Sequence, residues 1–197
     1  KAYPESYDVS YAYDAAGRRT FMAYPDGYGL NYSYDAANRL IRISDASDNT
    51  MVAYEYDAGG RRTKKTLGNG TYTTYQYDDL YRLTLLVNNA AGGAVQSQFG
   101  YTYNAGGMRT SMTSVEGVHN YTYDNTYQVI GVSYPDGRTV GYDFDAVGNR
   151  KSTTDNGALT VYSSNTLDQY TQVGSETFTH DTNGNLNPLP KRNLWIL

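Results

Sequence analysis

Aspartates recur along this chain, and carboxylates at regular spacing could hold a hard cation or act as general acid and base. Each of them, however, stands as a single carboxylate in a turn sequence, without the alternating Asp and Asn run of a calcium loop. We therefore expect turn chemistry at these positions, with no metal ion and no cofactor. The Asp or Asn markers stand at positions 14, 35, 57, 78, 104, 124, 145, 165 and 181.

Other residue types give catalysis no support. His119 and His180 are the two histidines, and we expect each to be a strand histidine with satisfied hydrogen bonds. No serine has a triad partner at a readable position. The Gly-rich pieces Gly68-Asn-Gly70 and Gly92-Gly93 have no following helix or Lys to hold phosphate. The sequence thus predicts no catalytic residues and no enzyme.

Tyrosines two residues apart come just before the markers. In a strand, residues i and i+2 point to the same face, so the pairs predict rows of rings on a sheet. Packing of the sheet against itself is the favoured interpretation, and a sugar-stacking surface is the alternative. The pairs are Tyr11 and Tyr13, Tyr32 and Tyr34, Tyr54 and Tyr56, Tyr75 and Tyr77, and Tyr121 and Tyr123.

A glycine three residues after the marker completes a hairpin turn. The marker side chain accepts backbone hydrogen bonds, and glycine adopts the positive φ that closes a three-residue hairpin with a bulge. This motif is formed by Asp14 with Gly17, Asp57 with Gly60 and Asp145 with Gly148, and Asp35, Asp78 and Asp124 begin turns without the glycine. Tyr81 and Tyr127 replace the glycine in two units, and there we expect another turn type, because the left-handed region costs Tyr about 1 kcal/mol.

A second turn lies between successive markers. It reads Tyr24-Pro-Asp-Gly27, Leu67-Gly-Asn-Gly70 and Tyr134-Pro-Asp-Gly137, and its Pro and Gly suit a tight turn. Each unit should therefore hold two strands of about seven residues and two turns. An insertion at 87–94 is predicted to form a longer, mobile loop.

The markers recur about every 21 residues, and such a period is typical of arrays whose units bury their apolar faces against their neighbours. The sequence predicts an all-β fold of tandem hairpins forming one continuous curved antiparallel sheet. About nine units should occupy residues 1–186. Residues 187–197 form a Pro-containing tail outside the repeat, in which Leu194, Trp195, Ile196 and Leu197 are expected to cap the last unit.

Arginines follow several of the turns, close in register to tyrosines and acids. Ion pairs and cation-π contacts are expected there, each contributing about 0.5 to 1 kcal/mol when exposed. These arginines are Arg18, Arg39, Arg61, Arg82 and Arg150.

Composition argues against several partners. The formal net charge is -4, and the 16 Lys and Arg recur with the repeat, so no nucleic-acid partner is expected. No apolar run is long enough to span a membrane, and the first residues are not a signal peptide, so any export signal would lie outside this chain. The start at Tyr3 and Tyr7-Asp8 resembles a worn unit, which indicates that the chain derives from something longer.

The Y-x-Y-D-x-x-G-R core, the Y-P-D-G-R-T turn at 134–139 and the spacing closely resemble the RHS repeat, also called the YD repeat. The resemblance covers residues 7–186. It implies a sheet of hairpins that winds in a spiral and, in long arrays, closes into a hollow shell, as in bacterial polymorphic toxins, insecticidal toxin complexes and teneurins. It also implies a secreted or cell-surface location.

One family feature is missing. Toxin-type members end their repeats with a segment resembling P-x-x-x-x-D-P-x-G-L that supports self-cleavage, and residues 183–197 do not match it. About nine units supply about eighteen strands, fewer than a sealed shell needs, so this chain alone is expected to be an open, curved sheet.

The preferred function is a non-enzymatic structural and interaction module, a segment of an RHS-type shell or surface fibre. Its expected partners are further repeats, copies of itself or a toxin cargo. The alternative is a carbohydrate-binding or adhesion module with exposed tyrosine rows and a glycan partner, and a processing enzyme or toxin carrier is the third reading.

Overall fold

A computed structural model of the chain describes residues 8–187. Every regular secondary-structure element in this range is a β-strand, so the all-β prediction is confirmed. The strands are β1 (Ser10–Tyr13), β2 (Arg19–Ala23), β3 (Gly29–Tyr34), β4 (Leu40–Asp45), β5 (Thr50–Tyr56), β6 (Arg62–Leu67), β7 (Tyr72–Tyr77), β8 (Leu83–Asn89), β9 (Val95–Tyr103), β10 (Arg109–Ser114), β11 (Gly117–Tyr123), β12 (Val129–Ser133), β13 (Thr139–Phe144), β14 (Arg150–Asp155), β15 (Ala158–Ser164), β16 (Tyr170–Val173) and β17 (Glu176–Thr177).

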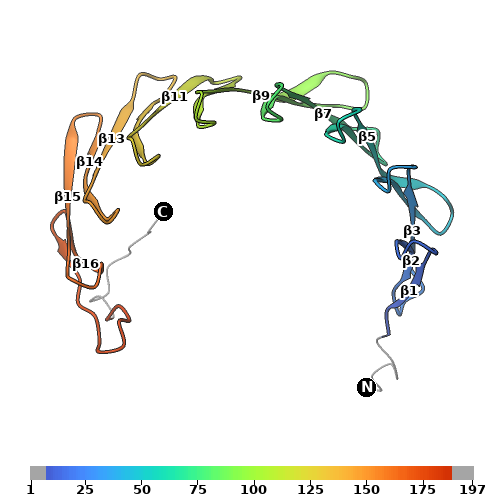
Figure 1. Cartoon of the computed structure of the whole chain (residues 1–197), viewed down its shortest axis with the longest axis horizontal. Coiled ribbons are helices and arrows are strands. Elements are labelled where there is room, and N and C mark those ends of the chain that lie inside the picture. The colour runs from blue at the N-terminus through green and yellow to red at the C-terminus, as the bar shows by residue number, and fades with distance from the viewer. Residues whose placement is uncertain (1–7, 188–197) are drawn as a thin grey trace. The chain divides into compact units, whose positions relative to one another are not determined.

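The strands fall into two compact units, one of residues 8–102 and 113–115 and one of residues 103–112 and 116–187. In the first unit each strand from β1 to β9 pairs with the next in antiparallel register (Figure 1). In the second unit the same holds from β11 to β17. The expected order of tandem hairpins is thus confirmed within each unit.

Turns of two kinds alternate because consecutive strands run in opposite directions. The turns that begin at the Asp and Asn markers are here called aspartate turns. In the first unit they follow β1, β3, β5 and β7, so they all lie at the same ends of the strands, along one border of the sheet. The other turns, here called opposite turns, lie at the other ends of the strands. Gly17 N donates to Asp14 O at 3.0 Å with φ 75° at Gly17, and Gly27 N donates to Tyr24 O at 3.0 Å. Both predicted turn sequences are confirmed.

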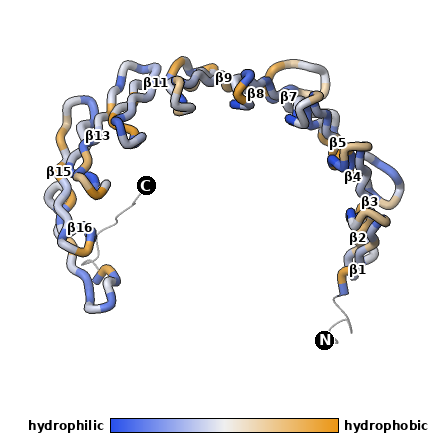
Figure 2. Tube along the Cα trace, in the orientation of Figure 1, coloured by the Kyte–Doolittle hydropathy of each residue, from blue (hydrophilic) through white to orange (hydrophobic). Residues whose placement is uncertain are grey.

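Very few side chains are buried, since each strand lies in a sheet without a second layer over it. Among the described residues, the buried hydrophobic side chains are Met22, Tyr32 and Val140, and the buried polar ones are Ser44, Thr73 and Asn89. Hydrophilic and hydrophobic residues mix along the strands of each unit (Figure 2). Cohesion must therefore come from neighbour-to-neighbour contacts, as expected for a repeat array.

Residues 87–94 do not form the longer loop that the sequence predicts. The insertion lengthens strands instead, since β8 continues to Asn89 and β9 begins at Val95, joined by a turn in which Gly93 N donates to Ala90 O at 2.9 Å. Asn88 explains the difference. Its side chain accepts a hydrogen bond from Thr73 Oγ1 and donates one to Ser97 Oγ, both at 2.8 Å, so a polar residue is satisfied inside the sheet.

The prediction of another turn type at Tyr81 and Tyr127 is also wrong. Both residues adopt the left-handed conformation of the glycine that they replace, with φ 64° and 68°. The expected cap formed by Leu194, Trp195, Ile196 and Leu197 lies outside the described residues. Residues 8–187 contain no helix with the length and apolarity that a membrane crossing requires.

Candidate functional site

Each aspartate turn of the first unit is closed by its own arginine. In the turn that begins at Asp14, carboxylate Oδ1 accepts hydrogen bonds from the backbone N-H groups of Ala16 and Arg18, both at 2.9 Å. Oδ2 pairs with Arg18 Nε at 2.6 Å. The same ion pair recurs between Asp35 and Arg39, Asp57 and Arg61, and Asp78 and Arg82, at 2.6 to 2.7 Å.

The same arginines also reach the next aspartate turn. Arg39 Nη1 donates to Asp57 O at 3.0 Å, and Arg61 Nη1 donates to Asp78 O at 2.8 Å. Each guanidinium lies over the ring of the second tyrosine of the next unit. The distances from the guanidinium carbon to the ring centroid are 4.9 Å for Arg18 and Tyr34, 4.8 Å for Arg39 and Tyr56, and 5.3 Å for Arg61 and Tyr77.

Tyrosine hydroxyl groups complete these steps. Tyr34 donates to Arg19 O at 2.9 Å, and Tyr56 donates to Leu40 O at 2.7 Å. The aspartate carboxylate, the arginine guanidinium, and the ring and hydroxyl of the next unit's second tyrosine therefore connect each aspartate turn to the next. We call this set the turn ladder, and it comprises Asp14, Arg18, Tyr34, Asp35, Arg39, Tyr56, Asp57, Arg61, Tyr77, Asp78 and Arg82.

The first tyrosine of each pair makes a different contact. Arg19, one residue beyond the turn ladder, lies 4.3 Å from the centroid of the Tyr32 ring, and Arg62 lies 4.5 Å from that of Tyr54. The predicted ion-pair and cation-π contacts of the arginines are confirmed. Sequence reasoning missed that two successive arginines contact different tyrosines of the next unit. Arg18 lies over the second tyrosine, Tyr34, and Arg19 lies over the first, Tyr32.

Tyr81 shows how a left-handed tyrosine is tolerated. Its ring centroid lies 4.8 Å from the guanidinium carbon of Arg61, and a Cβ added to Gly59 would be 3.4 Å from its hydroxyl. The ring thus lies against the preceding aspartate turn. Such an exposed cation-π contact contributes about 0.5 to 1 kcal/mol, which is comparable to the backbone cost.

The second unit lacks the arginines of the turn ladder. The corresponding position, four residues after the marker, is occupied by Met108, Gln128, Asn149, Gln169 and Asn185. Side-chain amides connect some of these turns to the next one instead. Asn149 Nδ2 donates to Asp168 Oδ1 at 2.8 Å, and Gln169 Nε2 donates to Gly184 O at 3.2 Å. Comparing this position along the sequence would have revealed the change.

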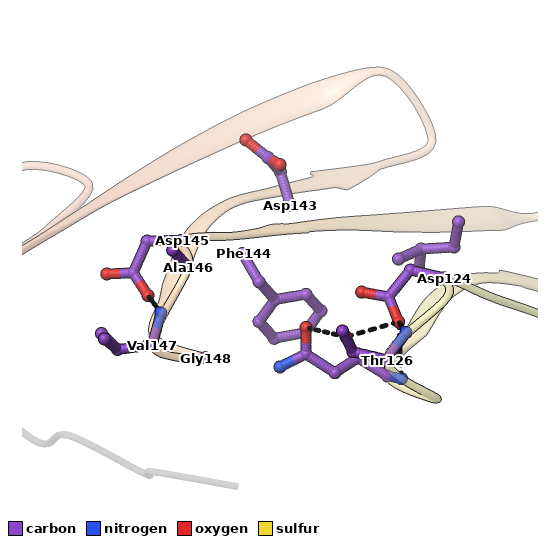
Figure 3. A pocket seen from close by; sticks show the side chains of 10 residues that line it. Asp124, Thr126, Asp143, Phe144, Asp145, Ala146, Val147 and Gly148 are labelled. Carbon is purple, nitrogen blue, oxygen red and sulfur yellow. Dashed lines mark hydrogen bonds between the residues drawn. The ribbon is translucent and has the colours of Figure 1, made fainter.

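A hollow of about 490 Å³ lies between the turns that begin at Asp124 and Asp145 (Figure 3). Phe144 stands here where the ladder has the second tyrosine, and Gln128 stands where the ladder has arginine. Asp143 precedes Phe144 in β13, with its side chain on the other side of the strand, and pairs with Lys151 Nζ at 3.0 Å. The sequence analysis did not single out this place.

Neither histidine joins these groups. His119 lies in β11 with its ring edge-on to Tyr134 at 5.3 Å between centroids, and no described hydrogen-bond partner reaches its buried Nδ1. The expected strand position of His119 is thus confirmed. His180 forms an isolated β-bridge with Leu186.

Hydrogen bonds in the turn ladder lower the pKa of its carboxyl groups. The backbone N-H and then the side chain of Arg18 hold the pKa of Asp14 below its usual value of 3.8, and the side chain of Arg61 is the main cause for Asp57. The pKa values of Asp35 and Asp78 are lowered chiefly by the backbone N-H groups of Arg39 and Arg82. All four carboxyl groups are thus ionised at neutral pH.

Stability should consequently fall in acid. A carboxyl group whose folded-state pKa is depressed stabilises the fold above its unfolded pKa, and this contribution is lost as the pH falls through the folded pKa. We expect the melting temperature to hold from pH 7 to about pH 5 and to fall below about pH 4. Replacing the four ladder aspartates by Asn keeps the turn acceptor and removes the charge, so this variant should melt lower at pH 7 and lose less in acid. Circular dichroism gives the melting temperatures. If acid lowered the melting temperature equally in both proteins, the ladder carboxylates would not be the cause of the acid sensitivity.

Comparison with known proteins agrees with this geometry. Residues 34–72 match the RHS Repeat family. A search of curated proteins gave no match. The chain resembles part of the Photorhabdus luminescens Tc holotoxin pore structure, with 19% identity and a TM-score of 0.69, over 94% of this chain and 12% of that chain.

Two crystal structures show the same likeness. TcdB2-TccC3 has 18% identity and a TM-score of 0.71, and TcdB2-TccC3 without its hypervariable C-terminal region has 17% and 0.72. This chain is covered over 94% in both and spans 12% of each of those chains. These likenesses show a shared fold. The match to the RHS Repeat family is limited to residues 34–72, which run from the end of β3 to the start of β7.

Proposed function

We propose that this chain is a non-enzymatic structural and interaction module, a segment of an RHS/YD-repeat shell or extracellular surface fibre that encloses cargo or assembles with copies of itself. The repeat array is proposed to span residues 1–186, with 187–197 outside it. Its charged and aromatic side chains mainly connect one turn to the next, which favours a structural role rather than catalysis. The likeness to the Tc holotoxin pore structure supports a secreted or cell-surface location and a toxin cargo.

The observation that carries the proposal is the exposure of β1. Tyr11 of β1 is 49% exposed, whereas Tyr32, its equivalent on β3, is 9% exposed. All four side chains of β1 are exposed. A further hairpin beside β1 would bury Tyr11 as β1 and β2 help to bury Tyr32, so β1 is suited to pair with another repeat or another copy.

Self-association tests this role of β1. We expect sedimentation velocity to show dimers or larger species as the concentration rises from about 1 to 300 μM, in the affinity range of a small interface. Tyr11→Lys places a charge on the edge strand and should leave a monomer at all concentrations. Leu159→Lys, at an exposed position of β15, serves as the control with the same added charge and should associate like the unchanged protein. A strict monomer throughout would count against open-edge assembly.

A second function is favoured by two tyrosines. Tyr81 and Tyr127 are 62% and 67% exposed, and an exposed tyrosine ring can stack on a sugar. Binding on a glycan array that is lost in Tyr81→Ala or Tyr127→Ala would favour carbohydrate recognition over the first function.

A further inference from the structure

We propose that the hollow between Asp124 and Phe144 receives the guanidinium group of an arginine side chain from a partner polypeptide. The hollow lies within the second unit, and the arginine steps of the first unit supply the comparison. It goes beyond the proposed shell function, because it holds for any polypeptide that presents arginine to this surface.

The chain itself shows how such a place is filled. In the steps from Asp14, Asp35 and Asp57, the guanidinium pairs with carboxylate Oδ2 of its own turn at 2.6 to 2.7 Å and lies 4.8 to 5.3 Å from the centroid of the next unit's second aromatic ring. A carboxylate and a ring face at this spacing thus form a guanidinium site in three separate places. The step from Asp124 keeps the carboxylate and the ring and lacks the arginine.

The carboxylate of Asp124 retains an oxygen for a ligand. The backbone N-H groups of Thr126 and Gln128 and the Thr126 hydroxyl all donate to Oδ1, at 2.8 to 2.9 Å. Among the described residues, none of the hydrogen bonds to Asp124 ends on Oδ2, the atom that binds arginine Nε elsewhere in the ladder. A guanidinium can therefore add to this carboxylate without breaking the turn.

Gln128 does not replace the missing cation. It is neutral and shorter than arginine, and its Oε1 lies 3.4 Å from Thr126 Oγ1. Its Nε2 lies 3.2 Å from where a Cβ on Gly148 would be, so the amide points toward the next turn. Space consequently remains beside the Phe144 ring, which lies between the two turns in Figure 3.

The charge around the hollow is complementary to a cation. Asp124 and Asp145 line it, whereas the side chain of Asp143 lies on the other side of the strand from Phe144 (Figure 3) and is paired with Lys151. Asp145 Oδ2 accepts a hydrogen bond from Asn149 Nδ2 at 3.2 Å. Because this amide is neutral, the negative charge of Asp145 is not compensated by it. A planar guanidinium fits better than an ammonium group, because it can stack on the ring and pair with a carboxylate at once.

The test uses the full chain and N-acetyl-L-argininamide as the probe, followed by two-dimensional ¹H–¹⁵N NMR at constant ionic strength. We expect amide shifts confined to Thr126, Gln128 and Gly148, with a dissociation constant of about 1 to 10 mM, reasonable for one small group in an open hollow. N-acetyl-L-citrullinamide, which is neutral and of nearly the same shape, should give no such shifts.

Two variants locate the site. Asp124→Asn should weaken binding about three- to fivefold, as for loss of an exposed ion pair, and it should fold, because Asn104 and Asn165 begin equivalent turns in this chain. Gln128→Arg should fill the hollow from within and abolish probe binding. Asp181→Asn is the control at an equivalent position outside the hollow, and it should bind like the unchanged protein.

Three results would overturn the proposal. These are unperturbed amides at about 50 mM probe, far above the expected dissociation constant, equal shifts with the citrulline analogue, or undiminished binding in Gln128→Arg. Each is separate from the self-association result, so the site and the shell function fail independently.

Discussion

Replacing Gly68 by Ala should lower the free energy of unfolding by about 2 to 3 kcal/mol, the range for forcing extra atoms into a packed place. A Cβ at this position would overlap the backbone carbonyl oxygen of Thr50 and lie 3.5 Å from Cα of Met51. Gly68 N also donates to Met51 O at 2.9 Å, which holds the turn against β5. Because the obstacle is backbone, the alanine can be accommodated only by moving β5 or the turn.

Gly92→Ala is the matched control for this change. Gly92 also lies in an opposite turn of the first unit, nothing lies within 4 Å of its added Cβ, and its φ is not positive. It should be neutral or stabilise the protein by up to about 1 kcal/mol by restricting the unfolded chain. Urea denaturation followed by circular dichroism gives both values, and equal effects of the two substitutions would show that the close approach at Gly68 does not matter.

Tyr32→Ala should cost about 3 kcal/mol, near the lower end for removal of a buried aromatic side chain. Tyr32 is one of the few buried side chains of the first unit, and it lies opposite Ile43 across β3 and β4. The Arg19 guanidinium would lose a ring 4.3 Å away. The substitution therefore removes apolar burial and a cation-π contact together.

Tyr11→Ala is the control, because Tyr11 holds the same place in the repeat on the exposed strand β1. Its ring is 49% exposed, and its distance to Arg19 is longer, at 5.9 Å. The expected loss is about 0.5 kcal/mol, as for a surface position. The two values come from the same denaturation measurement. A loss at Tyr11 as large as that at Tyr32 would mean that the repeat position, and not burial between neighbours, determines the energy.

Much of the fold could be predicted from the sequence because its determinants are local. Asp14 with Gly17 specifies a hairpin turn by hydrogen bonds and φ preference within five residues, and the period of two places Tyr11 and Tyr13 on one face. The ion pair of Asp57 with Arg61 also lies within one turn. Such features recur with the repeat and need no knowledge of distant residues.

The hollow and the close approach at Gly68 were not predicted, because both depend on what the neighbouring hairpin supplies. Pro25, Ala91 and Pro135 stand where Gly68 stands in its own turn, so the sequence indicates a freely replaceable position, and only the approach of Thr50 makes glycine necessary. The hollow beside Phe144 likewise arises from an arginine that is present in other steps and absent at Gln128.

The sequence by itself determined the hairpin unit, its repetition and the all-β class, since those follow from contacts between residues close in the chain. Only the tertiary structure decided that Tyr81 keeps a left-handed turn, that Asn88 extends a strand, and which carboxylates have an arginine partner. Those outcomes depend on contacts between adjacent hairpins, where the energy of a conformation depends on side chains about 20 residues away.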